Sequence, residues 1–224
     1  MGSSTVLGTF VGFIFIFSYN AVNACKASSC IGVTLYYESL CGDSMNFVKR
    51  QLLPNYDSLK DHLDITFIPY GKASHQVDET GKWSFACQHG PDECEGNKAQ
   101  ACGLYAIDKV ESSEDRAHLS VKFVGCAMAH ENLGEPIEQC ATTAGLSSKA
   151  KEMLKECATS QFGDDLFAAH GDRTHNLTPS LSFVPTIVIN EQYSSKNQQA
   201  ALSNFKGLIC GLLPQENKPS SCGN

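Results

Sequence analysis

Eleven cysteines in 224 residues constrain this chain more than any other feature of its sequence. Secreted proteins use cysteine at this density to form disulfides, whereas cytosolic thiols are kept reduced. Because eleven is odd, one sulfur must stay free, react, or bond to another molecule. The cysteines are Cys25, Cys30, Cys41, Cys87, Cys94, Cys102, Cys126, Cys140, Cys157, Cys210 and Cys222. The cysteine without a partner within the chain is therefore the first candidate for a functional residue.

An apolar segment precedes the first cysteine. Residues 1–24 carry no charged side chain, and Val22 and Ala24 provide small residues three and one places before a cut. This pattern is typical of a signal peptide, and its apolar core is shorter than the roughly 20 residues of a membrane span. We expect residues 25–224 to form a mature protein without a membrane span, in the secretory pathway, with an extracellular or a lysosomal or endosomal destination.

The size and charge of the mature chain narrow its class. About 200 residues suit a single domain with a substantial core. The formal net charge is −7, which argues against nucleic acid or anionic membranes as partners.

The first part of the mature chain predicts a β-α-β unit with a cysteine in its first turn. Residues 33–37 alternate as a strand does and run directly into Cys41. Apolar residues then follow at helical spacing over 45–52, and Pro54 is expected to end that helix. A second strand is predicted over 63–67.

The middle of the chain predicts helices, and the last part returns to α/β. We interpret residues 72–174 as a helical insertion stapled by its own disulfides, followed by a polar loop over 171–181. The helical patterns within the insertion cover 97–110, 114–128, 148–157 and 162–170. The final unit is a buried strand at 186–189, a turn at 190–192 and an amphipathic helix at 198–212.

Cys41 has the setting of a redox nucleophile. Backbone N–H groups and the helix dipole at a helix N-terminus stabilise a thiolate, whereas negative charge from Glu38 and Asp43 opposes this effect. In thiol–disulfide exchange a second cysteine three positions further on usually resolves the mixed disulfide, but here that position is Ser44. The alternative is that Cys41 is a structural cysteine paired with one of the other ten.

A second cysteine cluster lies between Cys87 and Cys102, and it contains Cys94 and His89. These residue types can bind zinc, but the spacing fits no common zinc motif and the oxidising compartment favours disulfides. We therefore assign no metal and no cofactor. For His89, a structural hydrogen bond is a better interpretation than catalysis.

The same segment carries a family resemblance. Residues 87–102 match the pattern C-Q-H-G-x2-E-C-x2-N-x4-C at every defined position, and the chain resembles the gamma-interferon-inducible lysosomal thiol reductases (GILT). Further similarity lies in 33–42, 68–73, 81–85 and 184–185. The resemblance implies a single α/β domain with a thioredoxin-like core at about 31–71 and 181–213, a helical insertion at about 72–174, and reduction of protein disulfides in acidic vesicles.

The resemblance also assigns roles to residues. It places the nucleophile on Cys41 and implies a cis Pro185 beside it, where the preceding backbone pairs with a substrate strand. It does not supply a resolving cysteine, because Ser44 stands there. The cysteines taken as signature or structural residues are Cys87, Cys94, Cys102, Cys126, Cys140, Cys157, Cys210 and Cys222.

The resulting functional hypothesis is a GILT-like thiol–disulfide oxidoreductase with one nucleophile. Cys41 attacks a disulfide-bonded protein substrate, Ser44 helps to hold the thiolate, and Pro185 positions the substrate. A small-molecule thiol reductant then resolves the mixed disulfide. The alternative is a catalytically weak or inactive secreted binding or regulatory protein that keeps the same fold.

Two further expectations concern covalent modification. We expect local disulfides within 87–102, between Cys126 and Cys140, between Cys210 and Cys222, and between Cys25 and Cys30. Asn176 begins the sequon Asn-Leu-Thr and is the candidate glycosylation site.

Overall fold

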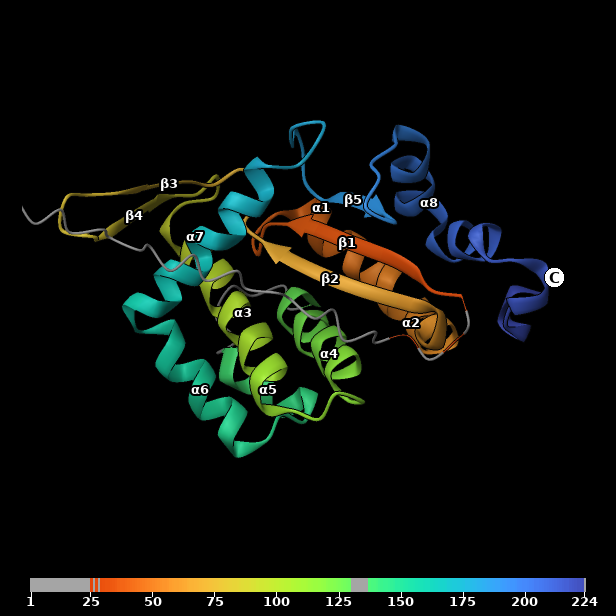
Figure 1. Ribbon diagram of the computed structural model, residues 1–224, viewed down its shortest axis with the longest axis horizontal. Coiled ribbons are helices and arrows are strands. Elements are labelled where there is room, and N and C mark those ends of the chain that lie inside the picture. The colour runs from red at the N-terminus through yellow and green to blue at the C-terminus, as the bar shows by residue number, and fades with distance from the viewer. Residues whose placement is uncertain (1–24, 26, 28, 130–136, 224) are drawn as a thin grey trace, which may run out of the picture.

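The computed structural model describes residues 25, 27, 29–129 and 137–223 (Figure 1). The predicted signal peptide lies outside these residues.

The described residues contain a central sheet of three strands in the order β2-β1-β5 (Figure 1). The central strand β1 (Ile31–Tyr37) pairs in parallel with β2 (Leu63–Pro69) and antiparallel with β5 (Thr186–Ile189). All four residues of β5 are buried, because helices and loops cover both faces of the sheet. This agrees with the expectation of a continuous apolar strand there.

The alternation of β1 divides its side chains between two cores. Leu35 and Tyr37 pack into the main core, which also contains Phe47 of the first helix and Phe205 of the last helix. On the opposite face, Tyr36 packs in a smaller cluster with residues of β2 and β5. Adjacent residues of a strand point to opposite faces of the sheet. The position of each residue in β1 therefore decides which of the two cores its side chain joins.

The predicted end of the first helix at Pro54 is wrong. The helix begins as α1 (Gly42–Phe47), continues through the π-helical turn η1 (Val48–Leu52) and extends as α2 (Leu53–Leu59), with α-helical backbone angles at the junctions. Pro54 lies in the first turn of α2, after the π-helical turn. Because N–H groups at the start of a helix need no intrahelical partner, proline is tolerated there. A short 3-10 helix, η2 (Lys60–His62), then leads into β2.

The region between β2 and β5 is largely helical, as predicted. Disulfides staple it: Cys102–Cys157 joins the first and fourth of its helices, and Cys126–Cys140 joins the second and third. One of these helices was not predicted. The helices are α3 (Pro91–Val110), α4 (Arg116–Ala129), α5 (Ile137–Ala144, not predicted), α6 (Ser148–Ala158) and α7 (Gln161–His175).

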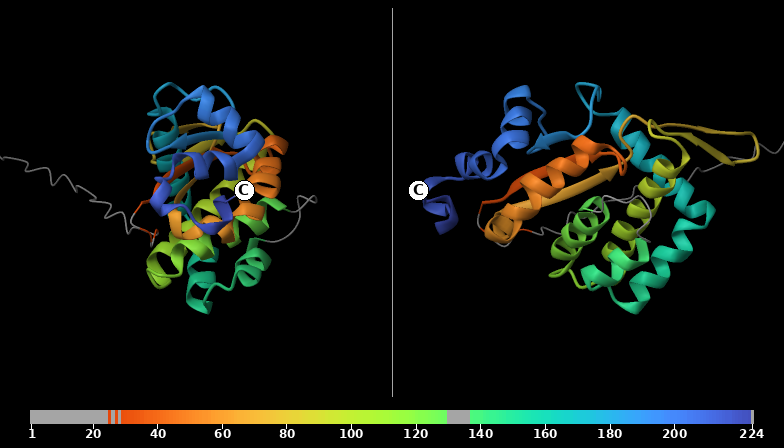
Figure 2. Two further views of the ribbon diagram at one scale, coloured as in Figure 1. Left: turned by 90° about the vertical axis from the view of Figure 1, so that its right-hand side faces the viewer. Right: turned by 180° about the vertical axis from the view of Figure 1, so that it is seen from behind.

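Two local predictions within this region need correction. A two-stranded hairpin, β3 (Ser74–Val77) with β4 (Trp83–Ala86), stands at the start of the segment that was interpreted as a helical insertion, and it projects from the body of the molecule (Figures 1 and 2). Helix α7 continues to His175, through part of the expected loop at 171–181. In this extension Gly171 packs closely against Tyr70 and His75, where a Cβ atom would come within 2.6 Å of either side chain, so the extended helix is packed against the hairpin and the end of β2.

The last helix, α8 (Ser195–Leu212), is broken in its middle. Asn204 has non-helical backbone angles, φ −154° and ψ 72°. Gln51 compensates from the neighbouring π-helical turn, because its side chain accepts a hydrogen bond from Phe205 N at 3.1 Å and donates one to Ser203 O at 3.3 Å. The chain ends in two 3-10 turns, η3 (Gln215–Asn217) and η4 (Ser220–Cys222). Within the described ranges, no helix combines the length and apolar character needed to cross a bilayer.

Candidate redox site

Cys41 lies at the N-terminus of α1, at the end of the turn that follows β1. Its N–H donates to Glu38 O at 3.3 Å, and its carbonyl accepts from Met45 N at 3.0 Å. All eleven cysteines lie within the described residues, where ten form five disulfides and Cys41 is free. The cysteine that the odd count leaves unpaired is therefore Cys41, in the turn of residues 38–41 between β1 and α1, which we call the redox turn. Of the Cys41 surface, 9% is exposed.

The residue pair before β5 lies against this thiol. Cys41 Sγ donates to Val184 O over 3.8 Å, and the Val184–Pro185 peptide bond is cis, as expected from the family resemblance. Gln198 of α8 holds this segment: its Nε2 donates to Pro185 O at 2.9 Å, and its Oε1 accepts from Ile187 N at 2.8 Å. A buried glutamine thus fixes the backbone that faces the Cys41 thiol.

Ser44 is one helical turn beyond Cys41 and is fully buried. Its hydroxyl has no hydrogen-bond partner among the described residues, so no hydrogen bond joins it to the thiol. A buried hydroxyl without a partner costs about 1–3 kcal/mol relative to one that is satisfied. The hydroxyl is therefore an unused donor one helical turn from Cys41.

The signature segment holds the turn in front of Cys41. Asn97 Oδ1 accepts from Ser39 N at 2.8 Å, and Glu93 O accepts from Ser39 Oγ at 3.1 Å. Gly96 lies between these two residues on α3, and a Cβ atom there would come within 2.6 Å of Ser39 Oγ. The glutamate, glycine and asparagine of the segment therefore serve as a platform for the redox turn.

A buried ionic cluster lies beneath the same turn. Glu38 and Glu93 are both fully buried, and His89 Nδ1 lies 2.5 Å from Glu93 Oε2 and 3.5 Å from Glu38 Oε2. Burial raises the pKa of Glu38; the hydrogen bond from the Lys72 N–H opposes the rise and the charge of Glu93 adds to it. Two close carboxylates repel each other, so the imidazole between them stabilises the cluster. His89 thus makes the expected hydrogen bond, to Glu93; that its role is structural stays a prediction.

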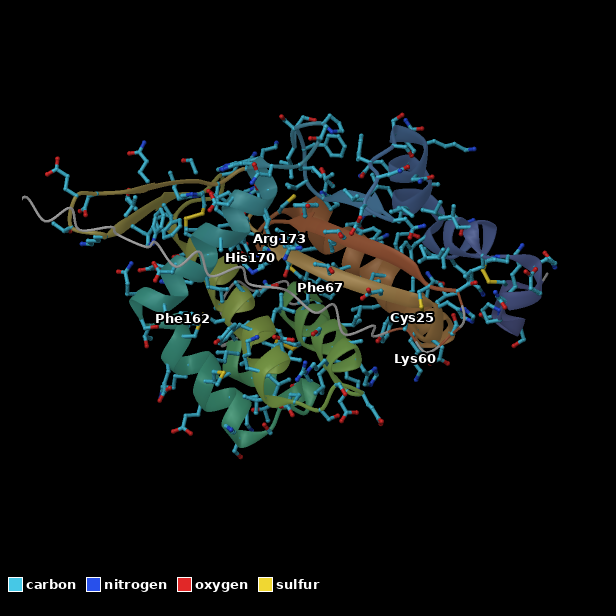
Figure 3. All side chains as sticks on the ribbon, in the orientation of Figure 1. Cys25, Lys60, Phe67, Phe162, His170 and Arg173 are labelled. Carbon is cyan, nitrogen blue, oxygen red and sulfur yellow. A yellow bond between two sulfur atoms is a disulfide. The ribbon has the colours of Figure 1, made fainter. Side chains whose placement is uncertain are left out.

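The disulfides follow most of the predicted pattern (Figure 3). Four local bonds are present as expected, and one joins residues far apart in the sequence. The local bonds are Cys25–Cys30, Cys87–Cys94, Cys126–Cys140 and Cys210–Cys222. The distant bond is Cys102–Cys157. Because every cysteine between residues 87 and 102 is oxidised, that cluster offers no thiolate to zinc.

Asn176 follows α7 at its C-terminal end and is exposed. Its side chain is thus accessible to modification, and glycosylation at this position stays a prediction.

Several residues of the site were missed by sequence reasoning. Ser39, Glu93, Asn97 and Gln198 were not identified as positioning residues, although two of them are defined positions of the signature. The sequence did contain one sign of this role. Within the signature segment 87–102, polar residues alternate with cysteines but do not fit a metal site. The contacts of Ser39 with Glu93 and Asn97 join segments more than 50 residues apart, and those of Gln198 join a helix to the segment before β5; local periodicity reveals neither.

Comparisons with known proteins agree with this geometry. The family model described as gamma interferon inducible lysosomal thiol reductase (GILT) matches residues 32–144. GILT-like protein 1 of Drosophila melanogaster is 36% identical over 187 residues, covering 80% of this chain and 74% of the relative. A gamma-interferon-inducible lysosomal thiol reductase-like protein of Anopheles gambiae is 32% identical over 197 residues, covering 85% and 80%.

A solved structure supports the fold. The crystal structure of Chlamydia trachomatis DsbA superposes with a TM-score of 0.52 at 9% identity, covering 79% of this chain and 86% of that chain. At this identity the likeness concerns the fold alone, a thioredoxin-type α/β core with helices inserted into it.

Proposed function

Because the chain belongs to the gamma-interferon-inducible lysosomal thiol reductase family, a family of thiol–disulfide oxidoreductases, we propose that it acts on protein disulfides through Cys41 alone. The observation that carries the proposal is the single free thiol at the start of α1, beside Val184 O, in a chain whose other ten cysteines are oxidised.

The proposed first step is an exchange of disulfide bonds. The Cys41 thiolate attacks one sulfur of a substrate disulfide, a bond forms between Cys41 Sγ and that sulfur, and the second substrate sulfur leaves as a thiolate that takes up a proton. No net oxidation or reduction has occurred at this stage. The product is a mixed disulfide between protein and substrate.

The proposed second step needs a thiol from outside the chain. A small thiolate attacks the substrate sulfur of the mixed disulfide, so that Cys41 leaves as a thiolate and the substrate carries the small thiol. A second small thiol then releases the substrate as a free thiol and forms the oxidised small-molecule disulfide. Because an intramolecular group reaches effective molarities of about 10⁵–10⁸ M in the best cases, its absence here makes the mixed disulfide long-lived.

Ser44 is proposed to assist the thiolate. Its hydroxyl is buried, has no partner among the described residues, and lies on the same face of the helix as Cys41. A thiolate is a better hydrogen-bond acceptor than a thiol, because charged acceptors form the stronger bonds. Rotation of the hydroxyl toward the sulfur on ionisation would satisfy both groups. The hydroxyl cannot attack a disulfide in place of a cysteine.

The segment before β5 is proposed to receive the substrate chain. Val184 O contacts the thiol, and the neighbouring Phe183 is 38% exposed and packs edge-on against Tyr193 at 6.4 Å between ring centroids. A substrate strand that brings its disulfide to Cys41 would pass over this aromatic surface. Disulfide-containing proteins are thus the proposed partners.

The five disulfides fit an oxidising environment. We propose that the protein enters the secretory route and acts either in acidic vesicles or outside the cell.

The proposal is tested by reduction of a disulfide-bonded protein at pH 5 with excess small thiol. Wild type is compared with Cys41→Ala, Ser44→Ala and Ser44→Cys. We expect slow turnover by wild type and a mixed disulfide visible by mass spectrometry, neither of which Cys41→Ala shows. Ser44→Ala should slow formation of the mixed disulfide, and Ser44→Cys should raise turnover by more than about tenfold because resolution becomes intramolecular.

The rival, a binding protein with an unused thioredoxin-like fold, predicts another result. Wild type and Cys41→Ala would then be equally inert, and Ser44→Cys would gain nothing. That outcome would refute the enzymatic proposal.

A further inference from the structure

A second group of chemically active side chains lies away from Cys41, where the β3–β4 hairpin meets the end of α7. We propose that His75, Asp172 and His175 bind a divalent transition-metal ion of the zinc type. Each residue offers one ligand atom, and the three atoms lie within 4.8 Å of one another. This site has no residue in common with the redox turn.

The backbone brings the three ligands together. Asp172 and His175 are three residues apart on α7, so their side chains share one face of the helix. His75 comes from β3 and points its Nε2 toward that face, 3.6 Å from Asp172 Oδ1. Two ligands bound tetrahedrally to zinc lie about 3.3 Å apart, given bonds of about 2.0–2.1 Å. The existing separations therefore need only side-chain adjustment.

The buried histidine is already oriented as a metal ligand. Tyr70 Oη lies 2.6 Å from His75 Nδ1, so a hydrogen bond holds the imidazole on its buried side. A ligand histidine typically donates its second ring N–H to a fixed acceptor, which selects the tautomer. With a metal bound, Tyr70 Oη would accept from Nδ1–H, and the lone pair of Nε2 would face the ion beside Asp172.

Aromatic rings fix the plane of the His75 imidazole. Its centroid lies 5.3 Å from that of Trp83 in an edge-on contact, and 5.4 Å from that of His175 in a stacked contact. The His75 side chain is only 11% exposed, whereas Asp172 is 70% exposed. The site is therefore rigid on its buried side and open to solvent on the other, which leaves a fourth coordination position for water.

The donor set selects the class of ion. Two imidazoles and one carboxylate suit zinc and its neighbours in the first transition series, whereas calcium and magnesium require oxygen ligands. The other group of similar composition, Glu38 with His89 and Glu93, differs in a decisive way. Its two carboxylates are fully buried, and a backbone N–H donates to one oxygen of each, so neither carboxylate is open to solvent as Asp172 is.

The sole tryptophan of the chain provides a local readout. Copper(II) quenches tryptophan fluorescence at short range and binds such ligand sets more tightly than zinc. We would titrate the folded Cys41→Ala protein with copper(II) and follow Trp83. We expect saturable quenching that zinc reverses in competition, and direct binding of zinc in calorimetry. The Cys41→Ala background removes the free thiol, which would otherwise react with copper.

Variants separate this site from other histidines. In the same background, His175→Ala and Asp172→Asn change exposed residues and should each weaken zinc binding by at least about tenfold. Even the loss of a group that only hydrogen-bonds to a metal ligand costs about 10–100-fold in affinity. His118→Ala, a histidine that stacks on Tyr56 elsewhere, should bind zinc like its parent. Absent quenching, quenching that zinc does not reverse, or equal affinity in all variants would overturn the proposal.

Discussion

His170 is expected to make the stability of this protein depend on pH between neutrality and pH 5. The residue lies on α7, where this helix passes β2 (Figure 3). Its Nδ1 has no hydrogen-bond partner among the described residues. Burial lowers the pKa of His170 to about 3, and the positive charge of Arg173 adds to this effect. The imidazole is therefore neutral in the folded protein at pH 5.

The size of the effect follows from linkage. In the unfolded chain a histidine takes up its proton near pH 6.5, whereas folded His170 does so only near pH 3. Between these values the unfolded state binds more protons, so stability falls as the pH falls, by about 1.4 kcal/mol per pH unit. Since pH 5 lies about 1.5 units below the unfolded value, His170 costs about 2 kcal/mol there and very little at pH 7.

The assay compares two proteins at two pH values. His170→Gln cannot be protonated, so its free energy of unfolding should fall about 2 kcal/mol less between pH 7 and pH 5 than that of the parent protein. Urea unfolding without reductant, in the Cys41→Ala background, avoids disulfide exchange during the measurement. Contributions from other groups, including the raised pKa of Glu38 that acts in the opposite direction, cancel in this difference.

A second histidine provides the control. Desolvation also lowers the pKa of His118, but its ring is only partly covered, stacking on the buried Tyr56 on one side. His118→Gln should therefore change the pH dependence less than His170→Gln. If parent and His170→Gln lose the same stability on acidification, the buried imidazole does not carry the cost and the reasoning fails.

Two further predictions concern packing and covalent links. Gly96→Ala should destabilise the protein by about 1–3 kcal/mol in urea unfolding, because the new Cβ atom meets Ser39 Oγ. As a control, Gly211→Ala in α8 has open space around it and should stabilise the protein by up to about 1 kcal/mol. Equal effects of the two substitutions would contradict the platform role of α3. Loss of the Cys102–Cys157 bond in a double alanine variant should cost about 4 kcal/mol, because it closes a loop with a sequence separation of 55. The bond nearest the N-terminus, with a separation of 5, should cost about 2 kcal/mol, and a reversed order by calorimetry would refute the loop argument.

Short-range features of this protein were predictable from its sequence. The alternation of 33–37 and the helical spacing after it located Cys41 at a strand-to-helix turn, which the structure confirms. The odd cysteine count required an unpaired sulfur, and the short links such as Cys126–Cys140 followed from proximity along the chain. These features depend on steric and hydrophobic preferences that act within one or two turns of the backbone.

Features that join distant segments were decided only by the tertiary structure. The sequence alone did not pair Cys102 with Cys157, place Asn97 against Ser39, or bring His75 to α7. Pro54 shows that local sequence can mislead even within one helix. The π-helical turn before Pro54 packs against α8, and the helix continues past the proline. In each case the free energy comes from burial and hydrogen bonds between segments whose proximity exists only after folding. The position of Cys41 at a strand-to-helix turn was therefore local information, whereas the platform on α3, the hydrogen bonds of Gln198 and the ionic cluster around it are properties of the folded chain.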